Sequence, residues 1–294
     1  MSNLTRRQFI QMGAAAVGSA ALPSTAAEKP RRTAVDWVEL NNSGIKITRL
    51  GMGTGSVGGS VQMALSDAEF TKLVRYAYDR GIRFFDTADS YGRGQMQARL
   101  GKALKGLDRD TYVVQTKMRR NGDPWKDIDR FRKEWDTDYF DLFLLHYCTS
   151  PAWPEELKKN RDILSEAKEK NYIRTKGASI HGLKGLRAMA QCDWMDTALL
   201  RVNHDGTLMD NEDNNNDEKG NVSDCVNYIK QIHEKGAGVI GMKIIGEGQF
   251  RDPAQREASI KYVMGLDCVD AVTIGFKSTQ EIDEAINLMN KYLA

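Results

Sequence analysis

Four side chains that could move a proton together occur in three successive segments of the chain. Asp86 and Tyr91 lie in "FFDTADSYG", Lys117 ends "VVQTK", and His146 ends "FDLFLLH". An isolated tyrosine has a pKa near 10, which is too high for efficient proton donation at neutral pH. A nearby lysine ammonium favours the phenolate and lowers that pKa, and a carboxylate keeps the lysine charged and in place.

The histidine would complete a general-acid group for a carbonyl oxygen. A histidine can orient or polarise a carbonyl, or relay its proton. No side chain supplies hydride, so reduction of the carbonyl requires a nicotinamide cofactor. Taken singly, each residue also has a structural interpretation, such as a helix cap, a packing aromatic or a solvated lysine. Their joint occurrence favours the chemical interpretation.

Each of these residues lies at or just after an apolar run of strand length, and such runs alternate with amphipathic stretches. The eight predicted strands are Leu50–Gly53, Arg83–Asp86, Tyr112–Thr116, Asp141–Leu145, Thr175–Ala178, Thr197–Val202, Gly238–Met242 and Ala271–Ile274. The segment 66–81 illustrates the helices, with Ser66 as the predicted N-cap and Gly81 just past the end. Its predicted buried face consists of Phe70, Leu73, Val74 and Ala77.

Eight strands alternating with helices predict an α/β fold, a (β/α)8 TIM barrel of parallel strands with right-handed crossovers. An N-terminal β-hairpin around Asn41–Gly44 would close the bottom of the barrel. An open doubly wound sheet is the rival, but no GxGxxG run leads from the first strand into a helix. In a barrel, active sites lie where the strands end, and neighbouring strands are about 4.8 Å apart. The four side chains can therefore converge on one rim.

The first 27 residues predict an export signal rather than part of the barrel. Arg6 and Arg7 precede the apolar run Met12–Leu22, which is too short for the ~20 residues of a membrane span, and small residues follow. This layout resembles a twin-arginine (Tat) signal. The alternative is an N-terminal helix that is retained. We therefore expect a signal peptide over residues 1–27, a barrel over residues 28–294, and a periplasmic or otherwise exported protein that uses the Tat machinery. The protein would stay in the cytoplasm if the signal is not used.

The composition excludes several classes of function. Without Arg6 and Arg7 the chain has as many basic as acidic residues, so nothing indicates a nucleic-acid binder. No membrane span is expected after cleavage. The four cysteines form no CxxC pair, which gives no support to a zinc or iron–sulfur site, and we expect buried free thiols, with one disulfide as the alternative.

With these elements in place, residues 36–292 resemble the aldo-keto reductase family. The resemblance depends on "GIRFFDTADSYG", "VVQTKM", "DYFDLFLLH", "KGAS" and "GFKSTQEIDEAI" in this order. It implies that Asp86, Tyr91, Lys117 and His146 form the catalytic group, with Tyr91 as the proton donor. It also implies reduction of aldehydes and ketones with NADP(H), NAD(H) being the alternative, by a barrel that is often a monomer.

The resemblance also implies the residues that hold the cofactor. Ser179 matches a serine that binds the nicotinamide carboxamide, although Ile180 replaces the asparagine expected beside it. The glutamine expected on the sixth strand is missing, and Asn203 is a candidate substitute. Lys243, after the seventh strand, is a candidate phosphate contact or a solvated rim lysine.

The last strand and helix are expected to hold the adenosine phosphate. Lys277 and Ser278 fit a 2′-phosphate, because Ser278 lies near a helix start. Glu281 stands where a basic or amide residue is usual, and Ala285 stands where an adenine-binding asparagine would be. The preference between the two cofactors therefore stays open.

The leading hypothesis is an exported NAD(P)H-dependent oxidoreductase acting on a small carbonyl or sugar-like substrate, or on the alcohol in reverse. The alternative is a nicotinamide-nucleotide sensor or binding module with little turnover. A hydrolase with paired carboxylates has little support. The polar segment 209–224 is expected to be a long flexible loop, either a substrate lid or surface decoration.

Overall fold

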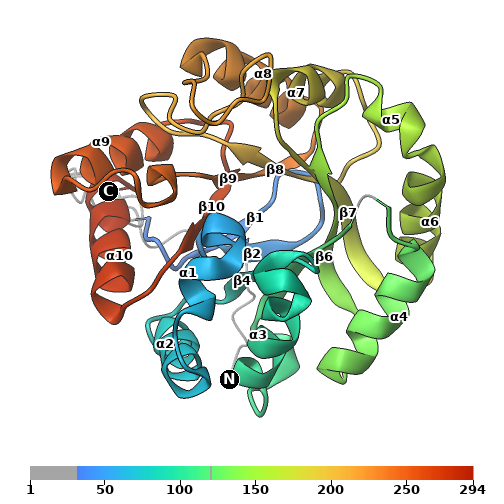
Figure 1. Cartoon of the computed structure of the whole chain (residues 1–294), viewed down its shortest axis with the longest axis horizontal. Helices are drawn as coiled ribbons and strands as arrows, with labels where there is room; N and C mark the ends of the chain where they lie inside the picture. Colours follow the sequence, from blue (N-terminus) through green and yellow to red (C-terminus); the bar gives the residue numbers. More distant parts are fainter. Residues whose placement is uncertain (1–31, 120, 294) are drawn as a thin grey trace, which may run out of the picture. The chain divides into compact units, whose positions relative to one another are not determined.

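A closed ring of eight parallel strands forms the centre of the described chain, residues 32–119 and 121–293, in this computed structural model (Figure 1). The ring order is β10-β3-β4-β5-β6-β7-β8-β9. The strands are β3 (Leu50–Gly53), β4 (Phe84–Asp86), β5 (Val113–Met118), β6 (Phe140–Cys148), β7 (Ile173–Ile180), β8 (Thr197–Arg201), β9 (Gly238–Met242) and β10 (Ala271–Gly275). The predicted barrel is confirmed. The predicted signal, residues 1–27, lies outside the described residues.

Helices surround the ring and leave its carboxyl end for loops (Figure 1). The longer helices are α2 (Asp67–Asp79), α3 (Met96–Leu104), α4 (Pro124–Trp135), α6 (Lys158–Glu169), α7 (Leu183–Ala190), α8 (Val222–Glu234), α9 (Pro253–Met264) and α10 (Thr279–Leu293). The short ones are η1 (Ser56–Gly59), α1 (Ser60–Met63), η2 (Tyr91–Gly94), η3 (Arg109–Thr111), α5 (Trp153–Glu156) and η4 (Gly246–Gly248). None of the helices in the described ranges is long and apolar enough to cross a membrane.

Helix α2 shows how the sequence sets these elements. Ser66 Oγ accepts a hydrogen bond from Glu69 N at 3.2 Å, and the Glu69 carboxylate accepts one from Ser66 N at 2.8 Å. This reciprocal cap satisfies two backbone donors that the first turn leaves open. The predicted apolar face of the helix is buried in the core, so both the predicted N-cap and the predicted core face are confirmed.

The N-terminal hairpin closes the amino end of the barrel. Strands β1 (Trp37–Glu39) and β2 (Lys46–Thr48) pair antiparallel, as predicted. Leu40 and Ile47 are fully buried in a cluster with side chains from inside the barrel, including Phe84 and Leu144. Apolar packing therefore fills the amino end of the barrel.

Strand β6 continues three residues beyond its predicted end. Its pairing with β7 shifts register between Leu145 and Cys148, which lets the ladder resume at Cys148 and Ile180. Tyr147 within this irregularity has φ of 60°, a conformation that costs energy in a non-glycine residue. His146 therefore lies inside a strand rather than after one. Leu145 before it and Cys148 after it both pair with β7.

The segment 209–224 is not mere surface decoration. Met209 and Asp210 are buried, and Asp210 Oδ1 accepts a hydrogen bond from Gly182 N at 2.7 Å. Leu183 N donates to Asn211 O at 2.9 Å, and the last residues of the segment already belong to α8. A buried carboxylate and backbone bonds thus fix the beginning of the segment on the barrel rim, which composition alone did not indicate.

The four cysteines form no disulfide bond within the described residues, and three of them are buried. Within the same residues, no cluster of three or more histidine, cysteine or acidic side chains is arranged to hold a metal ion.

Candidate active site

The structure brings the four predicted catalytic side chains together at the carboxyl ends of β4, β5 and β6. Lys117 Nζ lies 2.6 Å from Asp86 Oδ1 and 4.7 Å from the centre of the Tyr91 ring. The rings of Tyr91 and His146 meet edge to face, with centroids 5.5 Å apart. The predicted convergence of an acid, a phenol, an amine and an imidazole on one rim is therefore what the geometry shows.

Neighbouring strands fix the acid and the amine. Asp86 ends β4 opposite Gln115 on β5, and Gln115 Nε2 donates to Asp86 Oδ1 at 2.6 Å. Lys117 Nζ also donates to Thr87 O at 2.8 Å. Gln115 was not among the predicted site residues because it lies within the strand, although its position two residues before Lys117 places it on the same face.

Glycine leaves room for the phenol. Tyr91 begins η2, where its backbone N–H donates to Ala88 O at 3.2 Å. A Cβ built on Gly55 would lie 2.4 Å from the Tyr91 ring. Any larger residue at position 55 would displace the phenol, so the glycines after the first barrel strand shape the active site.

Burial and neighbouring groups shift the pKa of Lys117 in opposite directions. Full burial is the largest single influence and lowers the pKa of Lys117, but the Asp86 carboxylate and the Tyr91 phenol oxygen together outweigh it and leave that pKa above its ordinary value. The amine is therefore a stable ammonium at neutral pH, held by a charged partner inside the protein.

The pKa of Tyr91 shifts in the direction opposite to the one that we expected from the sequence. Burial raises the pKa of Tyr91 above its ordinary value, and the Lys117 ammonium only partly offsets this rise. The phenol therefore keeps its proton at neutral pH. We expected Lys117 to lower this pKa, and the direction of its influence is right, but desolvation of the phenolate is the larger effect.

His146 is a neutral imidazole at neutral pH. Burial, followed by the Lys117 charge, lowers the pKa of His146 to about 3. Its Nδ1 lies 3.1 Å from Ser90 Oγ, a contact that can select one tautomer. Ser90 is a second residue that the sequence argument missed, although it directly precedes Tyr91 in the same loop.

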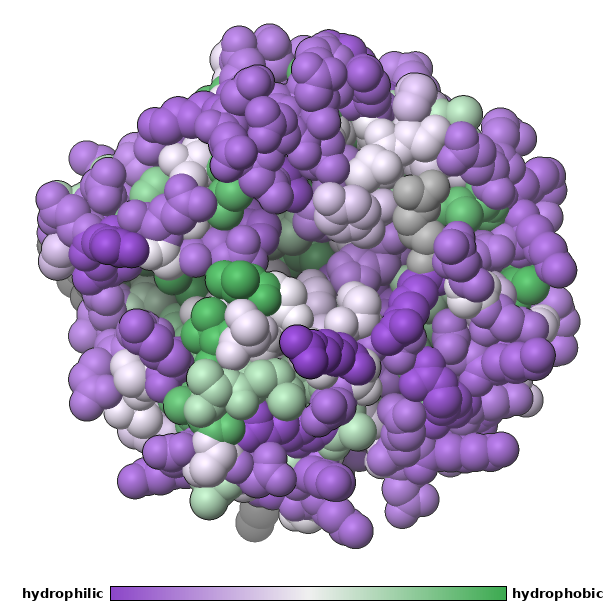
Figure 2. Space-filling view, in the orientation of Figure 1, coloured by the Kyte–Doolittle hydropathy of each residue, from purple (hydrophilic) through white to green (hydrophobic). Residues whose placement is uncertain are grey.

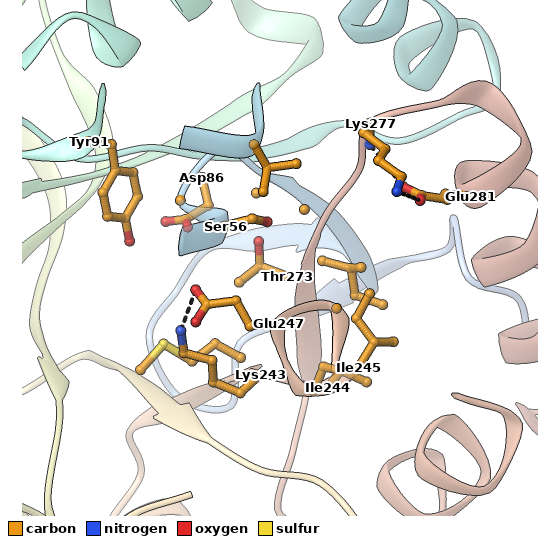
Figure 3. A pocket seen from close by; sticks show the side chains of 17 residues that line it. Ser56, Asp86, Tyr91, Lys243, Ile244, Ile245, Glu247, Thr273, Lys277 and Glu281 are labelled. Carbon is orange, nitrogen blue, oxygen red and sulfur yellow. Dashed lines mark hydrogen bonds and ion pairs between the residues drawn. The ribbon is translucent and has the colours of Figure 1, made fainter. Parts of the chain in front are cut away.

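A pocket extends from the catalytic group along the ends of β3, β9 and β10 (Figure 3). It encloses about 840 Å³, part of it open to solvent, and reaches from Asp86 and Tyr91 to Lys277 and Glu281. The face in Figure 2 is hollowed near its centre, where apolar residues lie inside a largely hydrophilic rim.

The lining of this pocket fits a dinucleotide. A Cβ on Gly275 would lie 2.0 Å from Ser56 Oγ, and a Cβ on Gly53 would lie 2.9 Å from Thr273 Oγ1, so glycine backbone lets the floor stay open. Thr273 Oγ1 is buried and has no hydrogen-bond partner among the described residues, and in Figure 3 this oxygen points toward Ser56. A buried hydroxyl without a partner is suited to bind a ligand atom.

Two predicted cofactor residues, Lys243 and Lys277, line this pocket. Lys243 Nζ pairs with Glu247 Oε1 at 2.6 Å, and the same carboxylate oxygen accepts a hydrogen bond from Val57 N at 2.8 Å. The loops after β3 and β9 are thereby joined across the pocket. Lys277 Nζ lies 3.8 Å from Glu281 Oε1.

Ser179 and Ser278 have partners within the chain. Ser179 Oγ, near the end of β7, accepts a hydrogen bond from Tyr147 N at 3.0 Å, which leaves its own O–H as a donor. Ser278 Oγ accepts a hydrogen bond from Glu281 N at 3.3 Å and so caps the start of α10.

The side-chain amide of Asn203 is bonded to the backbone of its own chain. Its Nδ2 donates to Thr207 O at 2.7 Å and to Lys243 O at 3.2 Å, and its Oδ1 accepts from Gly206 N at 2.9 Å. The side chain is fully buried and stabilises the loop after β8. Asn203 stays a candidate cofactor residue, and its amide would have to exchange one of these backbone bonds to contact a nucleotide.

A polar cluster that the sequence argument missed lies beside His146. Arg201, the last residue of β8, contacts His181 Nδ1 through Nη2, and its Nε lies 3.6 Å from Asp210 Oδ1. Burial raises the pKa of Asp210 to about 6 and keeps that of His181 well below its ordinary value. The Tyr147 ring lies over His181, with centroids 4.2 Å apart. Arg201 could have been found by inspecting the end of the sixth predicted strand.

Comparison with known proteins adds independent findings. The model of the "Aldo/keto reductase family" matches residues 49–292. "Aldo-keto reductase YhdN" of Bacillus subtilis (strain 168) is 29% identical over 178 residues, which cover 53% of this chain and 51% of that protein. "D-threo-aldose 1-dehydrogenase" of a Pseudomonas species is 44% identical over 78 residues, 26% of this chain and 23% of that protein. The chain thus spans about half the length, or less, of these curated relatives.

The same fold occurs in a solved structure. An aldo-keto reductase from Klebsiella pneumoniae in complex with NADPH superimposes with a TM-score of 0.64. The match covers 86% of this chain and 89% of that one, at 16% sequence identity. At 16% identity this likeness shows that the two proteins share the barrel fold, and nothing beyond the fold.

Proposed function

Because this chain belongs to the aldo/keto reductase family, we propose that it is an NAD(P)H-dependent oxidoreductase that reduces an aldehyde or ketone, or oxidises the alcohol in reverse. The observation that carries the proposal is the buried contact series from Asp86 through Lys117 to Tyr91 at one end of a long pocket. Such a series holds a protonated phenol beside the space where a carbonyl would bind.

Tyr91 is the proton donor in this proposal. The nicotinamide, when bound, supplies the hydride that the carbonyl carbon receives. As negative charge develops on the carbonyl oxygen, Tyr91 transfers its phenolic proton to that oxygen. The Lys117 ammonium stabilises the phenolate that remains, and Asp86 and Thr87 O hold the ammonium in place.

His146 orients the carbonyl. In this proposal Ser90 Oγ donates to Nδ1, which lies 3.1 Å away, so that the neutral imidazole carries its proton on Nε2 and donates it to the carbonyl oxygen. Its low pKa means that it acts as a hydrogen-bond donor and not as a cationic acid. The T-shaped contact of the imidazole with Tyr91 keeps both donors next to each other.

The nucleotide would lie along the pocket. Ser179 has a hydroxyl proton for the carboxamide, Thr273 offers its hydroxyl from the floor, and Lys243 and Lys277 offer ammonium groups for phosphates. The pairing of Glu247 with Val57 N would keep the pocket covered while the nucleotide is bound.

The proposed substrate is a small carbonyl compound or a sugar-like molecule. A partial relative is named as an aldose dehydrogenase, and the exposed Tyr147 ring over His181 offers an aromatic surface beside the catalytic group. Action as a monomer stays part of the proposal.

Export by the Tat machinery to the periplasm stays part of the proposal, because Arg6 and Arg7 precede a short apolar run. The Tat route carries folded proteins, so a bound nucleotide could travel with the enzyme. It would then have to be recycled in place by a second substrate. Stoichiometric nucleotide in protein purified from the exported fraction would support this, and protein found only in the cytoplasm would contradict it.

The decisive experiment replaces Tyr91 with Phe. We expect turnover of a carbonyl panel to fall to background while the affinity for NADH and NADPH changes less than about threefold, since only the phenolic proton is removed. Tyr76→Phe on α2, which loses only its hydrogen bond to Asp283, is the matched control. Retained turnover in Tyr91→Phe would contradict the assignment.

A sensor or binding module is the second candidate. Buried Ile180 and Ala285 stand where the resemblance expects amide side chains for the cofactor. Nucleotide binding without turnover of any carbonyl, in wild type as in Tyr91→Phe, would favour this function over the reductase.

A further inference from the structure

Two pockets meet at Lys277 and Glu281. The second pocket lies beyond the first and shares these two residues with it, together with Ile245, Gly248 and Ile274. Its other lining is largely apolar, and Phe250, Ile260, Phe276, Ala285 and Leu288 contribute. An apolar pocket suits a purine base. A dinucleotide that has its reactive end at Tyr91 and its base here must place the sugar of that base at the junction.

Chain contacts fix a carboxylate at this junction. Glu281 Oε2 accepts a hydrogen bond from Lys277 N at 2.8 Å, and Glu281 N donates to Ser278 Oγ. The Lys277 ammonium lies 3.8 Å from Glu281 Oε1 and is well exposed. Figure 3 shows these two side chains together at the end of the pocket away from Tyr91. The carboxylate therefore occupies a defined position and offsets the charge of the nearest cation.

We propose that Glu281 makes this protein prefer NAD(H) over NADP(H), which rests on the proposed reductase function. A carboxylate accepts hydrogen bonds from a ribose 2′-hydroxyl, but it repels a 2′-phosphate in the same place. In another dinucleotide fold an acidic residue makes the same distinction. The expectation that Lys277 and Ser278 hold a 2′-phosphate is thereby replaced by one in which Lys277 pairs with Glu281.

Besides Lys277, the second pocket is lined by two arginines, Arg251 and Arg256. Arg256 Nη2 and Nε donate to Glu284 Oε1 at 2.8 and 3.0 Å, and its Nη1 donates to the carbonyls of Phe250 and Arg251. Arg256 is therefore committed to its own chain. Arg251 also lines the pocket and is exposed to solvent. It is the cation that would hold a 2′-phosphate if the proposal is wrong.

The test measures binding without catalysis. The purified full-length protein, freed of nucleotide, is titrated with ADP-ribose and 2′-phospho-ADP-ribose, and separately with NADH and NADPH, by isothermal calorimetry. In each pair we expect the molecule without the 2′-phosphate to bind at least about tenfold more tightly. Glu281→Gln should reduce this ratio to within about threefold, and Glu281→Arg should reverse it.

A matched control and a folding check complete the test. Glu257→Gln removes an equal charge from α9, where Glu257 pairs with Lys291 away from both pockets, and it should leave the ratio unchanged. Thermal unfolding checks that each variant is folded. Equal or tighter binding of the 2′-phosphate forms by wild type, or an unchanged ratio in Glu281→Gln, would overturn this proposal and leave the reductase function intact. Absence of any nucleotide binding would overturn both.

Discussion

The two ends of the main pocket are built from opposite kinds of charge pair. At the reaction end, Lys117 and Asp86 are 0% and 5% exposed and stand on adjacent strands. At the nucleotide end, Lys277 and Glu281 are 67% and 35% exposed and pair along the start of one helix. A buried pair is strongly coupled and costly to break, whereas an exposed pair contributes little and is screened by salt.

This contrast indicates which part of the pocket fixes the geometry of the reaction and which part selects the nucleotide. The reaction end is held by strand pairing and buried hydrogen bonds, so its geometry persists without a ligand. The rest of the pocket depends on contacts between loops, such as that of Glu247 with Val57 N. These can open to admit a nucleotide. Substitutions at the first end should therefore change the chemical step, and substitutions at the second should change binding.

The largest effect is expected for Lys117→Met. The variant removes the ammonium that stabilises the Tyr91 phenolate and leaves Asp86 buried without a cation, so kcat should fall by about 10³-fold. Unfolding should also become easier, because an unpaired buried charge costs about 3–5 kcal/mol. Steady-state kinetics and denaturant unfolding measure the two effects.

Lys243→Met is the matched variant at a second charge pair that lines the same pocket. It removes an equal charge from the 18%-exposed partner of Glu247, and we expect an increase in the cofactor KM with less than about threefold change in kcat. A fall in kcat as large as that of Lys117→Met would break the contrast between the buried catalytic pair and the charges that only bind the nucleotide.

The stability of the reaction end should depend on pH through His146. Its pKa is about 3 in the folded state and near 6.5 in an unfolded chain, so below pH 6.5 the unfolded state binds a proton that the native state does not. Unfolding free energy should therefore fall as the pH drops from 6.5 toward 3, by up to about 1.4 kcal/mol per pH unit for this group.

Two neighbours contribute to the same pH range and must be separated from His146. His181 acts in the same direction, because its pKa is also lowered. Asp210 acts in the opposite direction between about pH 4 and 6, because its folded pKa is raised to about 6. The measurement is therefore the difference in slope between wild type and His146→Asn in urea unfolding. An equal slope in both proteins would contradict a neutral buried His146.

The sequence predicted the reaction end far better than the nucleotide end, for a physical reason. Asp86, Lys117 and His146 lie on consecutive parallel strands, and strand periodicity with barrel topology brings such residues together. The fold was predictable for the same reason, since β3 and β9 have the predicted bounds. Strand ends such as Cys148 on β6 were less predictable, because a bulge extends the pairing.

Residues around the rest of the pocket meet through loops, for which no periodic rule exists. Val57 and Glu247 are 190 residues apart, and nothing in their spacing indicates contact. Asn203 was assigned by position relative to a missing glutamine, but local turn bonds already use its amide. The influence of burial on Tyr91 was also beyond the sequence, because the extent of desolvation depends on the packed structure.

A smaller effect is expected for Glu247→Gln. The amide keeps an acceptor for Val57 N but loses the charge that attracts Lys243, so the contact between the two loops weakens. We expect nucleotide dissociation to accelerate by about three- to tenfold, measured by stopped-flow fluorescence, with the rate of hydride transfer unchanged in single turnover. A slower dissociation would show that this contact hinders the nucleotide instead of retaining it.

The smallest effect is expected from a change in ionic strength, which distinguishes the two ends of the pocket without a mutation. Raising the ionic strength from about 0.05 to 0.5 M shortens the Debye length from roughly 14 to 4 Å, which screens exposed charges such as those of Lys277 and Glu281. The ratio of NADH to NADPH affinity should therefore shrink by about two- to threefold, while single-turnover hydride transfer changes little because Lys117 and Asp86 are shielded from ions. A hydride-transfer rate that follows the affinity ratio would mean that both ends share one electrostatic environment. The contrast between a buried reaction end and an exposed nucleotide end would then be wrong.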